Sequence, residues 1–232
     1  MCRVFSRSDG TELEILRPPY CEICGNPIPN SFAETHPYCA ACRNCSDKQD
    51  PIIQVRAFGK YYSVEENPED ILSNEIRRFK SDKRVAPLLL ECMCHALDIM
   101  YPDLQELDVI VPVMRGTHDG GYNQSELLAR GIASKYDKPL MDILYKQVPY
   151  RSMHTIHDHH EKEVEISGKI GCNHVFERAE SILLIDDTCI DMVTKRECAR
   201  VLKTNGASII KSLVLGRMVT IRHMETLRSY ND

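Results

Sequence analysis

The sequence predicts an α/β fold, in which a parallel-sheet domain follows a small, cysteine-rich module at the N-terminal end. Two short apolar runs, at residues 108–113 and 181–185, are typical of strands that are buried on both faces of a sheet. Each run is followed by a segment with helical features. Strands that alternate with helices indicate a parallel sheet covered by helices on both faces.

We divide the chain into a cysteine cluster at residues 1–50 and an α/β domain at residues 51–232, whose N-terminal strand and helices occupy residues 51–106. The predicted strands cover residues 52–62, 108–113, 140–145, 181–185 and 207–215. The predicted helices begin after the acidic turn 67–70 and cover residues 85–100, 124–136 and 193–204. Asn205-Gly206 is a typical stop for the last of them. Residues 147–172 are polar and rich in histidine, without a clear period.

Composition narrows the class of protein. The net charge of −5 gives no support for a general nucleic-acid binder. No apolar stretch approaches the roughly 20 residues that span a bilayer, and the N-terminus lacks the apolar core of a secretory signal. We therefore expect no membrane span and a cytoplasmic location, where structural disulfides are rare. The 11 cysteines then need another explanation.

Two cysteine pairs suggest a bound metal ion. Cys21 and Cys24 are separated by two residues, and Cys39 and Cys42 repeat the spacing. Four thiolates close a tetrahedral structural zinc site and leave no open position for catalysis. Cys45 and His36 are alternative ligands. Unrelated buried cysteines or a redox dithiol are weaker interpretations, since neither pair opens a helix after a strand.

Two predicted strands end in residues that could bind a ligand. Asp186 and Asp187 follow the second apolar run and precede a helix, where carboxylates could hold sugar hydroxyls or a metal ion. An exposed acidic turn that caps the helix is the competing interpretation. After the first apolar run come four further candidates: Met114, Arg115, Gly116 and Thr117. An arginine fork binds phosphate oxygens, and glycine permits close approach of the backbone.

Two charged segments can each be interpreted either as a solvated surface or as a functional site. The basic run at residues 77–84 is more typical of a solvated helix face than of a binding surface. The segment from His154 to Glu161 contains four histidines and could bind a transition metal or supply acid–base groups. We favour a solvated lid for this second segment.

From Cys21 to Arg217 the chain resembles the phosphoribosyltransferase family, and within it the ComF-like branch, which carries an N-terminal zinc ribbon. The resemblance rests on the cysteine pairs, residues 76–80, the stretch from Gly121 to Ala129, and residues 182–187 with the helix after them. It implies a parallel-sheet phosphoribosyltransferase-like domain joined to a small zinc-ribbon module. The order and spacing of the motifs support it more than any single motif does.

The resemblance also implies a role for each candidate residue. The acids Asp186 and Asp187 would bind the ribose hydroxyls of phosphoribosyl pyrophosphate. The pyrophosphate and its Mg²⁺ would face the four residues from Met114 to Thr117, and the segment 147–172 would be a mobile loop over the substrate. The 5′-phosphate would be held by a loop of seven residues: Thr188, Cys189, Ile190, Asp191, Met192, Val193 and Thr194.

The phosphate loop departs from the family pattern, Asp-Asp-x-x-Thr-Thr-Gly-x-Thr. Ile190 and Asp191 replace the two central threonines, Met192 replaces the glycine, and Gly120 replaces an arginine usual in the branch. Asp191 adds negative charge where a phosphate would bind. Two unit charges about 4 Å apart repel each other by roughly 4 kcal/mol at an effective dielectric constant near 20. Ligand binding is therefore a firmer expectation than turnover.

Two functions follow from the resemblance. The first is binding of phosphoribosyl pyrophosphate or a related ribose phosphate with Mg²⁺, with transfer of the phosphoribosyl group to a nitrogen nucleophile as the reaction. The second is a catalytically inactive adaptor in DNA uptake or DNA metabolism. That adaptor would bind DNA or a DNA-processing protein through the zinc module and the basic run.

Overall fold

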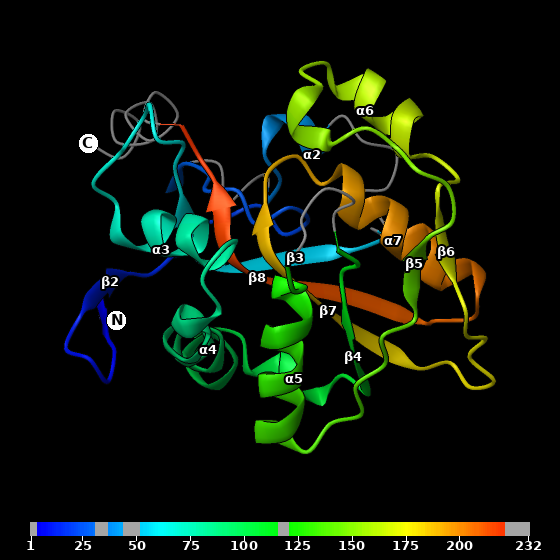
Figure 1. Cartoon of the computed structure of the whole chain (residues 1–232), viewed down its shortest axis with the longest axis horizontal. Coiled ribbons are helices and arrows are strands. Elements are labelled where there is room, and N and C mark those ends of the chain that lie inside the picture. The colour runs from blue at the N-terminus through cyan, green and yellow to red at the C-terminus, as the bar shows by residue number, and fades with distance from the viewer. Residues whose placement is uncertain (1–3, 31–36, 44–51, 116–120, 221–232) are drawn as a thin grey trace.

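The computed structural model describes residues 4–30, 37–43, 52–115 and 121–220 (Figure 1). Its centre is a four-stranded sheet with the order β3-β8-β7-β4, and every neighbouring pair is parallel. The strands are β3 (Gln54–Tyr61), β4 (Val109–Pro112), β7 (Ser181–Cys189) and β8 (Ile209–Met218). The predicted α/β fold with a parallel sheet is therefore confirmed.

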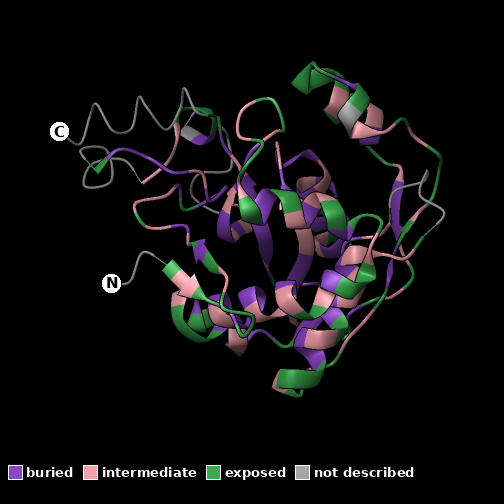
Figure 2. Ribbon diagram, turned by 60° about the vertical axis from the view of Figure 1, so that its left-hand side comes forward, coloured by how far each residue is buried: buried purple, intermediate pink, exposed green. Residues whose placement is uncertain are grey.

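Helices cover both faces of this sheet, as the sequence predicts. Leu183 and Ile185 of β7 share a buried cluster with α3 (Ile71–Phe79), α4 (Ala86–His95) and α5 (Gln124–Tyr136). The alternate residues Ile182 and Leu184 point to the other face and pack with α7 (Val193–Thr204). In Figure 2 the strands and the inner sides of the helices are buried, while the outer sides of the helices are exposed. Because helices bury both faces of the sheet, polar residues do not interrupt the apolar runs of these strands.

Local signals place the helix ends. The side chain of Asp70 accepts a hydrogen bond from Ser73 N at the start of α3, and Asn123 accepts one from Ser125 N at the start of α5. The helix α7 ends at the predicted stop, where Gly206 adopts a positive φ of 101°. The observed bounds of α5 and α7 coincide with the predicted ones. Beyond α4, the chain makes one π turn (Ala96–Met100) and a 3₁₀ turn (Pro102–Glu106) before β4.

The N-terminal segment packs directly on the sheet. It contains a hairpin of β1 (Val4–Ser6) and β2 (Glu12–Glu14) and the short helix α2 (Ala40–Arg43). Leu16 N donates to Phe58 O, and Val55 N donates to Ile23 O, so the segment is hydrogen-bonded to β3. Its buried side chains from Leu16 onward belong to the same cluster as those of α7, whereas Leu13 of β2 belongs to the cluster on the other face of the sheet. The proposed boundary near residue 50 thus separates two parts that share one core.

One strand and one loop differ from the sequence prediction. Leu140 makes a single parallel bridge to Ile110, and the strand β5 begins later (Leu144–Lys146). It pairs antiparallel with β6 (Ile170–Cys172), outside the central sheet. Between these strands, where the sequence has no clear period, lie a 3₁₀ turn (Met153–Thr155) and the helix α6 (His159–Ile166). Asp158 caps α6 by accepting a hydrogen bond from Glu161 N.

Among the described residues, no helix combines the length and the apolar character needed to cross a membrane. The expectation from hydropathy agrees with this finding.

A buried arginine joins the N-terminal segment to the end of β7. Arg217, on β8, is 5% exposed. Its Nε donates to Cys24 O at 2.9 Å, and its Nη1 donates to Cys189 O and Ile190 O, both at 2.6 Å. Three carbonyl groups, two of them in buried hydrogen bonds, thus receive hydrogen bonds from one guanidinium.

Arg217→Met should lower the free energy of unfolding by about 3 kcal/mol or more, because each buried polar group left without a partner costs about 1–3 kcal/mol. Urea denaturation measures this change. The matched control is Arg178→Met at an exposed position, which should shift the unfolding free energy by about 0.5 kcal/mol or less. Equal effects of the two substitutions would contradict this role of Arg217.

Candidate ligand-binding site

The acid pair lies where β7 extends beyond the end of its neighbour β4. The strand β4 ends at Pro112, which is paired with Ile185, whereas β7 continues to Cys189 alongside β8. Asp186 and Asp187 are therefore part of β7, not of a turn after it, and the prediction that they follow the strand is wrong. They still lie at the carboxyl end of the parallel sheet, beyond the last residue of β4. This is the edge of an open α/β sheet at which ligands bind.

A cavity of about 1040 Å³ opens at this edge. Both polar and apolar side chains surround it, and they come from β7, from the start of α7, from the chain after β4, from the start of α5 and from the chain around α6. The charged members of its lining are Glu65, Lys80, Arg115, Lys146, Lys162, Asp186, Asp187, Asp191 and Lys195. A cavity with this many convergent polar groups is a candidate binding site.

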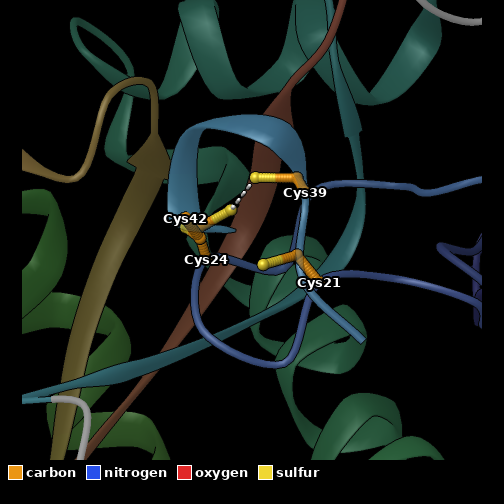
Figure 3. Close-up of side chains that lie close together, drawn as sticks. All are labelled: Cys21, Cys24, Cys39 and Cys42. Carbon is orange, nitrogen blue, oxygen red and sulfur yellow. Dashed lines mark hydrogen bonds between the residues drawn. The ribbon is translucent and has the colours of Figure 1, made fainter. Parts of the chain in front are cut away.

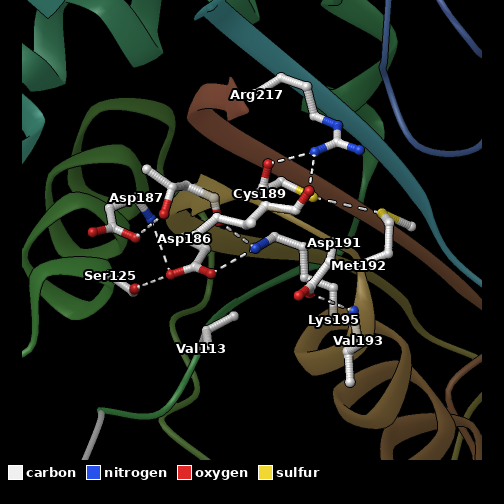
Figure 4. Close-up of polar contacts among 12 residues, drawn as sticks. Val113, Ser125, Asp186, Asp187, Cys189, Asp191, Met192, Val193, Lys195 and Arg217 are labelled. Atoms are coloured by element: carbon white, nitrogen blue, oxygen red, sulfur yellow. Dashed lines mark hydrogen bonds and ion pairs between the residues drawn. The ribbon is translucent and has the colours of Figure 1, made fainter. Parts of the chain in front are cut away.

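Asp186 is held by protein donors on both of its oxygens (Figure 4). Lys195 Nζ lies 2.6 Å from Oδ2, and Ser125 Oγ donates to Oδ1 at 2.7 Å. The backbone N–H of Asp187 also donates to Oδ1, at 3.0 Å. Lys195 is 3% exposed. Burial disfavours its charge, but the neighbouring negative groups, Asp186 first among them, outweigh burial and raise the pKa of Lys195.

Asp187 is the acid with capacity left for a ligand. Its Oδ1 accepts a hydrogen bond from Thr188 Oγ1 at 3.1 Å. Burial and the neighbouring charge of Asp186 raise the pKa of Asp187, although Lys80 and Lys195 act in the opposite direction. A carboxyl group with a raised pKa in a cavity is typical of a functional site.

The loop between β7 and α7 has a backbone conformation that would let an anion approach closely. Met192 has a φ of 71°, in the left-handed region that favours glycine, which is the residue the family pattern has at this position. The helix α7 starts without a side-chain cap from Met192. Val193 N donates to Asp191 Oδ1 at 3.2 Å instead, so that a carboxylate occupies the helix N-terminus. Helix N-termini favour negative charge.

A lysine from α6 neutralises that carboxylate. Lys162 Nζ lies 2.6 Å from Asp191 Oδ2. Burial alone would raise the pKa of Asp191, but the hydrogen bond and charge of Lys162 outweigh burial and lower it. Lys162 therefore offsets the repulsion that the sequence predicts between Asp191 and a phosphate. The sequence did not predict that this lysine lies beside Asp191.

The structure brings most of the predicted site residues together. The following line the cavity: Met114, Arg115, Asp186, Asp187, Thr188, Ile190, Asp191, Met192 and Thr194. Cys189 and Val193 are buried behind it, at 0% and 2% exposure. Gly116 and Thr117 lie outside the described residues.

Four basic residues of the lining were not predicted as ligand-binding residues: Lys80, Lys146, Lys162 and Lys195. The sequence could have indicated that Lys195 lies on the buried side of its helix, because it is three, four and seven residues from the buried Cys198, Ala199 and Leu202. Lys80 lies in the basic run and follows α3. For Lys162 the sequence gave no such indication, since the periodicity around it is weak.

The histidine-rich segment does not form a metal site in the described part of the chain. His159 lies 3.6 Å from Glu163 on the exposed side of α6, and His157 lines the cavity. Among the described residues, only the four cysteines form a group of three or more side chains that could hold a metal ion. The side chain of His154 is outside the described part.

The four predicted cysteines converge. The Sγ atoms of Cys21, Cys24, Cys39 and Cys42 all lie within 4.8 Å of one another (Figure 3). Cys24 Sγ and Cys39 Sγ are 3.6 Å apart. Zn–S bonds of about 2.3 Å in a tetrahedron place sulfur atoms at such separations. The cluster could therefore hold a metal ion such as zinc, whereas the alternative ligands His36 and Cys45 lie outside the described residues.

Comparisons with known proteins add the following. No known protein family matches the sequence, and no curated protein matches it significantly. Orotate phosphoribosyltransferase from Aeropyrum pernix is similar in structure, with a TM-score of 0.38 and 16% identity over 67% of this chain and 72% of that chain.

Two further solved structures are similar at the same level. Purine phosphoribosyltransferase from Pyrococcus horikoshii has a TM-score of 0.30 and 15% identity over 69% of this chain and 91% of its own. Adenine phosphoribosyltransferase from Trypanosoma brucei has a TM-score of 0.35 and 14% identity over 72% and 77%.

Cys42→Ser should abolish stoichiometric zinc binding, because three thiolates no longer complete the tetrahedral site. Elemental analysis of the purified protein measures this, with an expected change from about one zinc per chain to nearly none. Cys172→Ser is the matched control, since Cys172 lies outside the cluster. Unchanged zinc in Cys42→Ser would show that another residue completes the site.

Proposed function

We propose that the cavity binds phosphoribosyl pyrophosphate or a related ribose phosphate. One observation carries the proposal: an acid pair on β7 and the N-terminal end of α7 line the same cavity, at the carboxyl end of a parallel sheet. Such an arrangement offers acceptors for sugar hydroxyls beside donors for a phosphate.

The sugar would be bound mainly by Asp187. Asp186 already accepts hydrogen bonds from Lys195 and Ser125, which fix its position. Asp187 has one hydrogen bond to Thr188 and faces the same cavity. A carboxylate that accepts from two vicinal hydroxyls binds a ribose in a defined orientation.

The 5′-phosphate would be bound at the start of α7. Thr194 supplies a hydroxyl there, and the backbone N–H groups of the first turn point out of the helix. Lys162 would then move from Asp191 to the phosphate or bind both. Lys80, Arg115 and Lys146 also line the cavity and would face a second phosphate group.

The resemblance implies Mg²⁺ with the substrate. That ion is usually bound by one or two carboxylates together with water and substrate phosphates. Asp186 and Asp191 are each paired with a lysine, at 2.6 Å in both cases. Asp187 has no such partner and lines the cavity, so this acid would hold the ion together with the phosphates of the ligand.

No specific observation favours the adaptor role. Within the basic run, Arg78 and Arg84 both bind Asp82, and Arg77 donates to Tyr62 O. Lys80 lines the cavity. Because Asp82 offsets only one of the five basic residues, the run stays positively charged, and such a charge by itself is more typical of a solvated helix face than of a DNA contact.

Saturating phosphoribosyl pyrophosphate should stabilise the protein by about 2.7 kcal/mol at a hundred times its dissociation constant. Thermal denaturation with and without the ligand measures this, and release of pyrophosphate in the presence of amines tests turnover. Asp187→Asn should remove the stabilisation. Asp103→Asn should keep it, because Asp103 binds Lys211 and does not line the cavity. No stabilisation of the wild type would refute the proposed function.

Asp191→Thr should tighten binding of ribose 5-phosphate by about tenfold or more, which corresponds to about 1.4 kcal/mol. The substitution removes a negative charge from the N-terminus of α7 and frees Lys162 for the phosphate. Isothermal titration calorimetry compares the dissociation constants. Equal or weaker binding by the variant would place the phosphate away from this loop.

A further inference from the structure

The cysteine cluster and the cavity are joined by a buried side chain. In the described part of the chain, no cysteine of the cluster lines the cavity. Arg217 nevertheless contacts both sites, because its Nε donates to Cys24 O at 2.9 Å and its Nη1 donates to Cys189 O and Ile190 O at 2.6 Å. Cys24 is one of the four clustered cysteines, and Ile190 lines the cavity. The two sites are therefore one side chain apart.

Cys24 connects the cluster to Arg217 through two of its atoms. Its Sγ belongs to the cluster, and its carbonyl oxygen accepts from Arg217. The turn that contains Cys24 is closed by Gly25 N, which donates to Cys21 O at 2.9 Å. This turn lies tightly on β3, since a Cβ atom at Gly25 would be 2.8 Å from Val55 O. A metal ion held by Cys21 and Cys24 would therefore fix the position of Cys24 O.

At its other end, Arg217 holds the bend where β7 stops (Figure 4). The carbonyl groups of Cys189 and Ile190 both accept from the same nitrogen atom. Consecutive carbonyl groups of a regular strand point in opposite directions, so the chain leaves the strand conformation here. Ile190 and the next two residues, Asp191 and Met192, line the cavity, and we call these three residues the loop 190–192. The guanidinium therefore fixes the start of this loop.

The hydrogen bonds of Arg217 depend on one another. The residue is 5% exposed, so water has little access to replace a lost acceptor. If Cys24 O moved away, Nε of a buried, charged group would lack an acceptor, which is costly. The guanidinium would then shift to a new acceptor, and the carbonyl groups of Cys189 and Ile190 would follow it or lose their own hydrogen bonds. A displacement at the cluster therefore reaches the loop 190–192.

We propose that zinc in the cysteine cluster and a ribose phosphate in the cavity bind cooperatively, because Arg217 couples the turn of Cys24 to the loop 190–192. This inference rests on the proposed function. It assigns Arg217 as a positioning residue that acts through the carbonyl groups of Cys189 and Ile190. The cluster then has a role in ligand binding although it contributes no side chain to the described lining.

Calorimetric titration with ribose 5-phosphate tests the coupling. It compares the zinc-loaded chain with the chain that has been freed of zinc by a chelator in the presence of a thiol reductant. Removal of zinc should weaken binding by about fivefold or more, as is usual for coupled sites. Circular dichroism shows whether the zinc-free chain is folded.

The reverse measurement starts from the zinc-loaded chain. A chromophoric chelator competes for the zinc at equilibrium, with and without saturating ribose 5-phosphate. The sugar phosphate should lower the dissociation constant of zinc by the same factor, because the coupling between two binding sites is reciprocal.

A variant tests the role of Arg217. Arg217→Lys keeps the positive charge but loses the fork of donors, so zinc should change the affinity for ribose 5-phosphate by less than about twofold. Arg56→Lys is the matched control. Arg56 Nη1 donates to Glu22 O at 2.9 Å and so binds the cysteine-rich segment, but it lies on β3, which β8 separates from β7. This control should keep the full effect of zinc. The wild-type comparison does not depend on whether Arg217→Lys folds.

The outcomes separate the two proposals. Equal affinity of the wild type for ribose 5-phosphate with and without zinc overturns the inference and leaves the proposed function standing. A zinc-free chain that loses its helical signal overturns the inference too, since zinc would then stabilise the whole fold. A full effect of zinc in Arg217→Lys overturns the role of Arg217. Absence of binding under every condition refutes the proposed function and the inference with it.

Discussion

The ion pair between Lys195 and Asp186 determines the chemical character of the cavity. Both partners are buried or nearly so, and the lysine also binds Thr188 O. One side chain from α7 thereby binds two residues in the last part of β7. The two opposite charges compensate each other in the interior. Removal of either partner would therefore leave the other as an unpaired buried charge. Of the acid pair, Asp187 is then the member with acceptor capacity left for the proposed ligand.

The same loop is held from behind by Arg217. Its guanidinium binds the carbonyl groups of Cys189, at the end of β7, of Ile190, at the start of the loop, and of Cys24 in the cysteine-rich segment, so three parts of the chain meet at one buried group. The four cysteines lie next to this contact, since Cys24 belongs to both. A metal ion in the cluster would stabilise the turn that carries Cys24 O. The N-terminal module therefore supports the cavity without lining it.

The fold was predictable because its signals are local. Continuous apolar runs identify β4 and β7, and the helices α5 and α7 have the predicted bounds, with Asn123 and Gly206 as end signals. The paired spacing of the cysteines predicted their convergence. The strand β5 was misplaced because the run after Pro139 only touches β4 through Leu140 before it leaves the sheet.

The charge balance of the site was less predictable because it depends on distant partners. Asp191 is a lone acid in the sequence, and its neutralisation by Lys162 depends on the position of α6, which periodicity did not reveal. Lys195 was detectable in principle, since it shares the buried stripe of α7. A lysine in such a stripe signals an internal acid, and Asp186 is the acid nine residues before it. The positive φ of Met192 could not be foreseen from a residue that rarely adopts it.

A crystal structure with ribose 5-phosphate tests the account most directly. We predict the phosphate at the start of α7, within hydrogen-bonding distance of Thr194 and Lys162, and the sugar hydroxyls on the carboxylate of Asp187. A phosphate bound outside this loop, or a sugar that does not touch the acid pair, would contradict the account.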